Sequence, residues 1–137
     1  MNQVIFVSRS GNTKKVAESI ARGIGVTATA VAAGAQIDHA DVLFVGGALY
    51  AGKIDGKLRA FLETLTPGQV GKVVVFSTVA GNKSPLNEIK SILEARKIAV
   101  ADEVFCCKGS FLFLFGGRPN EEDLKKALDF AKRIIAA

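Results

Sequence analysis

The chain has 137 residues, 49% of them hydrophobic, and a formal net charge of +5 from 18 Lys and Arg against 13 Asp and Glu. This length suits one core that buries a sheet on both faces, so we expect residues 1–137 to form a single domain. The cations are spread along the chain without interleaved aromatic residues, so we expect no nucleic-acid partner. The longest apolar stretch, residues 111–115, is far below the roughly 20 residues of a membrane span, so we expect none. No signal-peptide pattern opens the chain, and we therefore expect a cytoplasmic protein.

The first half of the chain predicts one helix among three strands. A continuous apolar run at residues 3–8 predicts a strand buried on both faces. Residues 13–23 predict an amphipathic helix that ends at glycine, because Val16, Ile20 and Ile24 are four apart and most charged residues fall on the other side. An alternating pattern at residues 25–31 predicts a strand near a sheet edge, and residues 41–46 predict the next buried strand.

The second half continues the alternation of strand and helix. A helix is marked by Leu58, Phe61, Leu62 and Leu65, and residues 72–77 predict a strand. The next helix opens at Ser84, a capping residue, with Pro85 at its first position. Its inward side chains are Leu86, Ile89 and Leu93. After a strand at roughly residues 100–108, Asn120 caps the last helix, which has acidic residues 121–123 at its positive end. Its predicted inward stripe is Leu124, Leu128, Ala131 and Ile135.

This alternation from end to end predicts an α/β fold, with a parallel sheet between helices on both faces. In such a sheet a ligand binds beyond the carboxyl ends of the strands, where neighbouring connections leave in opposite directions. The loops that follow the strands at residues 3–8, 41–46 and 72–77 are therefore the candidate ligand loops.

The first of these loops is built from short polar side chains around a glycine. Its residues are Ser8, Arg9, Ser10, Gly11, Asn12 and Thr13. The free N–H groups and the dipole of the following helix favour a phosphate, and the hydroxyls can donate to its oxygens. A serine-rich turn with an ordinary helix cap is the alternative, and the chemistry of the loop alone leaves both open.

The run S-R-S-G-N-T after an apolar strand resembles the T/S-x-T/S-G-N-T phosphate loop of flavodoxins. Residues 45–52 resemble the second flavin loop of that family, and residues 117–123 resemble the start of its last helix. The resemblance implies a flavodoxin-like three-layer sandwich with a five-stranded sheet in the order 2-1-3-4-5. It also implies non-covalent FMN and a role in electron transfer between a reductase and an acceptor enzyme.

The same resemblance implies which residues hold FMN. The phosphate would be held by the first loop, Ser8 to Thr13, with Arg9 contributing its backbone N–H and a charge. The isoalloxazine ring would be held by Ala48, Leu49, Tyr50, Ala51 and Gly52, and by Thr78, Val79, Ala80, Gly81 and Asn82. Tyr50 is the candidate to stack on the flavin, and a partly buried core tyrosine is the alternative. The third loop departs from many flavodoxins in having no aromatic residue, which leaves one flavin face open or covered by an aliphatic side chain.

The basic charge balance is a second departure, because well-known flavodoxins are acidic. Arg9, Lys53, Lys83 and Arg118 lie in or near the predicted ligand loops. Positive charge there would stabilise the anionic reduced flavin and raise its potential, and a basic surface suits an acidic redox partner. The alternative is that these side chains extend into water, where screening leaves little effect.

Other functional classes find less support in the sequence. The main competing hypothesis is a small FMN-dependent oxidoreductase, linked to NAD(P)H or quinone and resembling protoporphyrinogen oxidases. In that enzyme, residues 111–115 would form a rim that contacts the substrate. The alternative for this run is packing on the core. The third hypothesis is a scaffold protein that keeps this fold and binds no flavin. No catalytic nucleophile, general base or metal site is predicted. The adjacent Cys106 and Cys107 would point to opposite faces of a strand, and we expect reduced packing residues.

Overall fold

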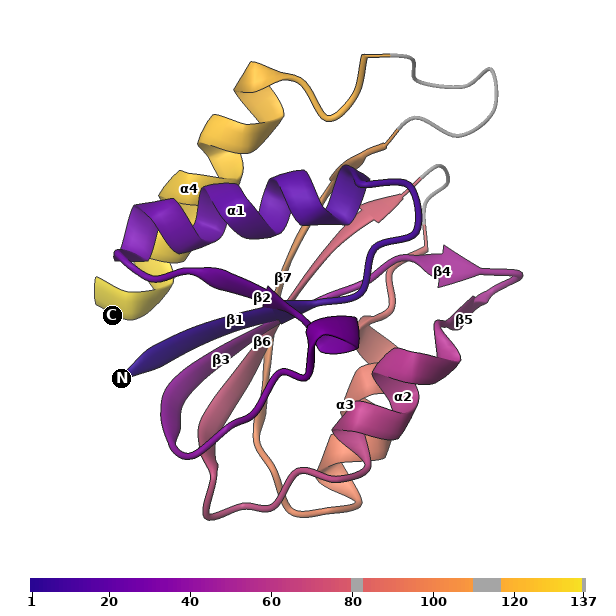
Figure 1. Ribbon diagram of the computed structural model, residues 1–137, viewed down its shortest axis with the longest axis vertical. Helices are drawn as coiled ribbons and strands as arrows, with labels where there is room; N and C mark the ends of the chain where they lie inside the picture. The colour runs from indigo at the N-terminus through magenta and orange to yellow at the C-terminus, as the bar shows by residue number, and fades with distance from the viewer. Residues whose placement is uncertain (80–82, 110–116, 137) are drawn as a thin grey trace.

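The computed structural model describes residues 1–79, 83–109 and 117–136. Its largest element is a five-stranded sheet in the order β2-β1-β3-β6-β7, with every neighbouring pair parallel (Figure 1). The strands are β1 (Asn2–Phe6), β2 (Ala28–Ala30), β3 (Ala40–Gly46), β6 (Val70–Val79) and β7 (Val100–Lys108). Numbered within this sheet alone, the order is the predicted 2-1-3-4-5, which confirms the fold class.

Helices cover both faces of the sheet. α1 (Asn12–Ile24) and α4 (Glu121–Ala136) pack against each other on one face, while α2 (Gly56–Leu62) and α3 (Leu86–Glu94) lie together on the other (Figure 1). A 3₁₀ turn, η1 (Val31–Ala33), follows β2. Within the described part of the chain, no helix combines the length and apolarity needed to cross a membrane.

The core consists of two apolar layers, because successive side chains of a strand point to opposite faces. On β3, Leu43 and Val45 belong to the layer beneath α2 and α3, whereas Phe44 belongs to the layer beneath α1 and α4. β6 repeats this division with Val75 and Phe76. A strand covered on both faces needs apolar side chains at every position, which is why the central strands read as continuous apolar runs.

A short antiparallel hairpin between β3 and α2 was not predicted. It consists of β4 (Leu49–Tyr50) and β5 (Lys53–Ile54). Ala51 and Gly52 form the turn, both with positive φ (53° and 80°), as a two-residue type I′ turn requires. Strands of two residues are too short to produce a period in the sequence, so no pattern indicated them.

The sequence had predicted that the first helix ends at Gly23. In the structure Gly23 lies inside α1. The helix runs on to Ile24, and Gly25 ends it in the left-handed region, with φ of 74°. A Cβ at Gly23 would lie 2.8 Å from Cγ of Leu128. The glycine is therefore explained by the close approach of α1 and α4, a contact that a one-helix pattern does not reveal.

The buried face of α4 is rotated from the predicted stripe. Its buried residues are Asp123, Ala127, Phe130, Ala131 and Ile134. Ile135 was predicted to face inward and is exposed. α4 packs on both α1 and the sheet, so its buried face is set by two neighbours instead of one apolar line.

The other helix boundaries differ from the predictions by small shifts. The N-cap position of α3 is Pro85, one residue later than predicted, while the hydroxyl of Ser84 accepts the N–H of Leu86 at 3.3 Å. Leu65 lies beyond the end of α2 but remains in the core.

Gly46, at the carboxyl end of β3, allows a test of this packing. A Cβ there would lie 2.1 Å from a ring carbon of Phe76. We expect Gly46→Ala to lower the free energy of unfolding by about 1–3 kcal/mol through overpacking. Gly68→Ala is the matched control, since a Cβ at Gly68 meets nothing within 4 Å. Urea denaturation measures both variants, and equal stability would contradict the contact.

Candidate functional site

The candidate site lies where two connections of the sheet diverge. From β1 the chain passes to α1 on one face, and from β3 it passes through the hairpin to α2 on the other face (Figure 1). β1 and β3 are neighbours in the sheet. The divergence of the connections at their carboxyl ends marks the usual ligand position in an open parallel sheet.

The first loop brings an uncapped helix end to this position. Gly11 stands at the N-cap position of α1 with φ of 90°, no side chain caps the helix, and the first turn contains no acidic residue. The hydroxyl of Ser8 accepts the N–H of Gly11 at 3.0 Å, which closes a turn ahead of the helix and leaves the helix itself uncapped. The alternative of an ordinary serine cap is therefore not what the structure shows.

This helix end has the chemistry that a phosphate needs. A Cβ at Gly11 would meet nothing within 4 Å, so the backbone is open to close approach. Ser10 is exposed on the same loop, and Lys14 and Lys15 follow in the first turn. N–H groups, a hydroxyl, the helix dipole and nearby cations all favour a dianion here. The donor set of the loop thus fits the phosphate of FMN.

A buried hydroxyl pair joins the first loop to the third. Oγ1 of Thr13 and Oγ1 of Thr78 lie 2.9 Å apart, and both residues are buried. Gly109 closes the same corner, because a Cβ there would lie 3.1 Å from Nδ2 of Asn12. Gly109 was missed by the sequence analysis; a glycine directly after a predicted strand was the only signal. The ends of β6 and β7 thus pack against the loop of residues 8–13.

Tyr50 lies in the second loop, at the end of β4, and is half-buried. The guanidinium carbon of Arg9 lies 3.7 Å from the centroid of its ring. Nε of Arg9 donates to Oδ2 of Asp55 at 2.8 Å. Three segments of the candidate site therefore meet in one cluster: the loop of residues 8–13, the hairpin and the start of α2.

Asp55 is a member of the site that the sequence analysis missed. Its Oδ1 accepts the N–H of Lys57 at 2.7 Å and caps α2. This backbone hydrogen bond, together with Arg9, holds the pKa of the Asp55 carboxyl below its ordinary value. An aspartate directly before a helix was the available signal, but it indicated a cap and gave no hint of the ion pair.

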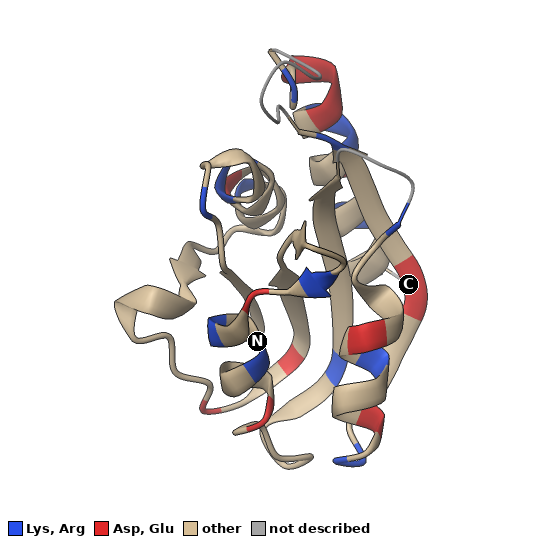
Figure 2. Ribbon diagram, turned by 90° about the vertical axis from the view of Figure 1, so that its right-hand side faces the viewer, with Lys and Arg blue, Asp and Glu red and all other residues tan. Residues whose placement is uncertain are grey.

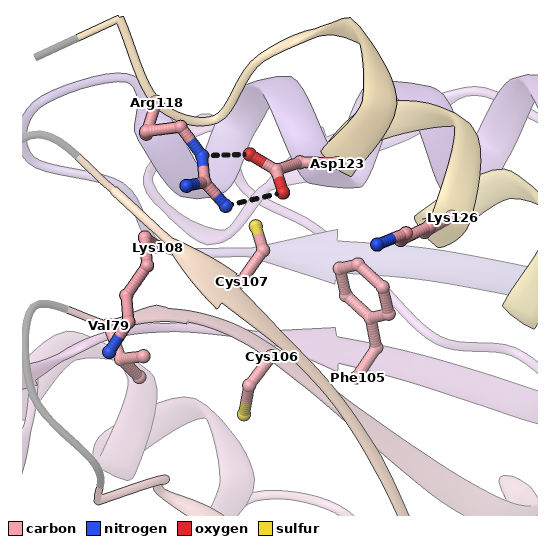
Figure 3. A pocket seen from close by; sticks show the side chains of 8 residues that line it. All are labelled: Val79, Phe105, Cys106, Cys107, Lys108, Arg118, Asp123 and Lys126. Carbon is pink, nitrogen blue, oxygen red and sulfur yellow. Dashed lines mark hydrogen bonds and ion pairs between the residues drawn. The ribbon is translucent and has the colours of Figure 1, made fainter. Parts of the chain in front are cut away.

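A second ion pair lies at the start of α4. Arg118 donates through two nitrogens to the carboxylate of Asp123, with Nη2 2.7 Å from Oδ1 (Figure 3). Asn120 and Asp123 cap each other, since each side chain accepts the other's backbone N–H at 2.9 Å. This confirms Asn120 as the cap, and the guanidinium of Arg118 lowers the pKa of Asp123.

A cavity of about 390 Å³ opens between this ion pair and the edge strand β7 (Figure 3). Its lining residues are Val79, Phe105, Cys106, Cys107, Lys108, Arg118, Asp123 and Lys126. Cys107 points toward the Arg118–Asp123 pair and Cys106 points away from it, so the prediction of opposite faces is confirmed (Figure 3). Both cysteines are free, but Cys106 is exposed and therefore not the packing residue that was predicted.

Lys and Arg are intermingled with Asp and Glu on several elements (Figure 2). Of the four cations expected near the ligand, Arg9 and Arg118 are paired with Asp55 and Asp123. Lys53 and Lys83 are exposed. No group of three or more metal-ligating side chains occurs in residues 1–79, 83–109 and 117–136. Ala80, Gly81, Asn82 and the run 111–115 lie outside the described residues.

Comparisons with known proteins agree with this architecture. Residues 3–112 match a family model described as "Flavodoxin domain". A curated relative, "Uncharacterized protein MJ0298" of Methanocaldococcus jannaschii, is 31% identical, and the match covers 90% of each chain.

Three solved structures illustrate the likeness of fold. Flavodoxin 1 from Bacillus cereus superposes with a TM-score of 0.75 at 19% identity, covering 98% of this chain and 97% of that one. A flavodoxin from the domain Archaea gives 0.69 at 19% identity, covering 98% and 96%. Rubredoxin oxygen:oxidoreductase from Desulfovibrio gigas gives 0.74 at 15% identity, and there the match covers 98% of this chain but 35% of the larger protein.

The two cysteines should differ in reactivity. Burial and the neighbouring carboxylate of Asp123 raise the pKa of the Cys107 thiol to about 12. At pH 8 only roughly one Cys107 in ten thousand is then a thiolate, the form that reacts. Partial desolvation also raises the pKa of Cys106, but its side chain remains accessible to a reagent in solution. We expect iodoacetamide at pH 8 to modify Cys106 alone, as read by mass spectrometry of peptides; equal modification of Cys107 would contradict this environment.

Proposed function

The chain belongs to the flavodoxin family, whose members bind FMN and transfer electrons, and we propose that its FMN phosphate is held by residues 8–13 at the start of α1. The observation that carries this assignment is the N-terminus of α1, which has no side-chain cap and no acidic residue in its first turn and lies at the carboxyl ends of the neighbouring strands β1 and β3. FMN, when bound, supplies the redox chemistry. The chain's own residues bind it, orient it and set the charge around it.

The ring would lie over the second and third loops. Ala48, Leu49, Tyr50, Ala51 and Gly52 form one wall, and Thr78 and Val79 contribute to the other, with Ala80, Gly81 and Asn82 as proposed partners from the same loop. Val79 is half-buried at the end of β6 and supplies an aliphatic surface. Two hydrogen-bonded connections support a common site: Thr13 with Thr78, and Arg9 with Asp55.

The effect of charge on the flavin should be smaller than the composition indicates. Arg9 and Arg118 each face a carboxylate, so their fields are largely cancelled at a distance. Lys53 and Lys83 remain, and both are exposed to screening by water and salt. We therefore propose that the charged residues raise the reduction potential of the bound flavin only modestly.

The partner of this carrier is proposed to be an acidic redox protein. Exposed lysines surround the carboxyl edge of the sheet: Lys14, Lys15, Lys53, Lys57 and Lys83. Charge of one sign beside a redox site steers the encounter with a partner of opposite charge. We further propose that residues 1–137 act as one domain, since both core layers share one sheet, and that the protein works in the reducing cytoplasm, where its two free cysteines would persist.

A negative charge in the phosphate loop tests the FMN site. Wild-type protein should bind FMN and quench its fluorescence. Ser10→Asp should weaken FMN at least about tenfold, because two like charges face each other at short range, and should change riboflavin binding little. Ser91→Asp is the matched control, since Ser91 is exposed on α3. Equal losses for both flavins, or none, would refute the assignment of the phosphate.

Small redox probes test the charge of the carboxyl edge. We expect reduced protein to be oxidised by anionic ferricyanide at a rate that falls as salt rises, and by cationic hexaammineruthenium(III) at a rate that rises with salt. Lys53→Glu should reduce both dependences. Lys97→Glu is the control, because Lys97 lies just before β7, at the amino-terminal end of the strands and away from the candidate site. Stopped-flow traces of flavin absorbance give the rates, and the reverse salt dependence would exclude a basic docking surface.

A further inference from the structure

The base of the β4–β5 hairpin is anchored in the core. Leu49 packs against the core layer beneath α2 and α3, and Ile54 is buried in it. The N–H of Ile54 donates to a carboxylate oxygen of Glu88 on α3 at 2.9 Å. Tyr50, paired with Lys53, lies at the closed end of the hairpin, next to the turn. A pair of two-residue strands is marginal by itself, so the ring of Tyr50 depends on support from outside the hairpin.

Arg9 supplies that support through a close contact with the face of the ring. Its guanidinium carbon lies 3.7 Å from the centroid of the Tyr50 ring, the separation of two stacked planar groups. The hydrogen bond from its Nε to Oδ2 of Asp55, 2.8 Å long, fixes the guanidinium from its edge. One contact sets the distance of the guanidinium from the ring and the other sets its direction.

Asp55 is itself held in place. It is 8% exposed, and its two carboxylate oxygens have separate partners. Oδ1 accepts the N–H of Lys57 at the start of α2, and Oδ2 accepts Nε of Arg9. The position of Arg9, whose side chain is otherwise 57% exposed, is thereby tied to the backbone of a packed helix.

We propose that Arg9 is a positioning residue for Tyr50: held by Asp55, it covers one face of the phenol ring and presents the opposite face to the isoalloxazine ring of FMN. This inference rests on the proposed FMN site. Arg9 belongs to the phosphate loop and Tyr50 to the ring loop, so their contact joins the two parts of the site within the protein itself. A ring that is fixed in advance loses less freedom when the flavin stacks on it, and binding is tighter.

Intrinsic fluorescence provides a direct measurement of this ring. Tyr50 is the single tyrosine of a chain without tryptophan, so the tyrosine emission comes from this residue alone. In flavin-free protein, Arg9→Gln should add a fast component to the anisotropy decay of that emission. Asp55→Asn should act in the same direction, because Asn keeps an oxygen for the Lys57 N–H but loses the charge that holds Arg9. Arg22→Gln, an exposed arginine in the last turn of α1, is the control and should leave the decay unchanged.

Flavin affinity provides the second measurement. Arg9→Gln should weaken binding about three- to tenfold, and by the same factor for FMN and for riboflavin, because the ring and not the phosphate loses its support. Arg9→Lys should show the same loss, since an ammonium keeps the charge but cannot stack as a plane. Fluorescence titrations of both flavins against wild type, the Arg9 variants and Arg22→Gln give these ratios.

The outcomes separate this inference from the proposed function. Full affinity in Arg9→Lys, or a loss confined to FMN, would show that Arg9 acts as a charge on the phosphate. Tighter binding in Arg9→Gln would show that Arg9 covers the face that the flavin uses. Unchanged anisotropy and affinity in every variant would remove any positioning role. A wild-type protein that binds neither flavin would instead refute the FMN site and, with it, this use of Tyr50.

Discussion

The divergence of two chain connections at the carboxyl ends of β1 and β3 is the constraint on which this site depends. Parallel strands need crossovers, and here the crossover after β1 covers one face of the sheet while the one after β3 covers the other. The two loops must therefore separate. The N-terminus of α1 is left facing the gap without a side-chain cap, and its N–H groups become the natural place for a phosphate.

Close packing brings the remaining loops to that helix end. Gly23 lets α1 approach α4, Gly46 accommodates the ring of Phe76, and Gly109 allows the end of β7 to lie against Asn12. The Thr13–Thr78 hydroxyl pair then connects the first and third loops in the interior. Rigid placement of this kind suits an electron carrier, because a cofactor held by a fixed frame needs little rearrangement when its charge changes.

Ion pairs decide how the basic composition acts at the site. Asp55 and Asp123 each hold an arginine, which turns Arg9 and Arg118 from free positive charges into structural groups. The exposed lysines around the same edge stay available for long-range attraction. Net charge alone would have assigned both kinds of residue the same role. The two arginines instead contact Tyr50 of the hairpin and Asp123 of α4, whereas the lysines face solvent.

The sequence by itself determined the alternation of strands and helices, the sheet, the polar loop after β1 and the Asn120 cap, because each depends on local periodicity or on a short run of residues. Only the tertiary structure decided the β4–β5 hairpin, the rotated face of α4 and the roles of Gly23 and Gly109. The cluster of Arg9, Tyr50 and Asp55 belongs to the same group, since Arg9 and its carboxylate partner are 46 residues apart. Contacts between distant segments leave no period in the sequence, and they exist only once the strands have brought those segments to one edge.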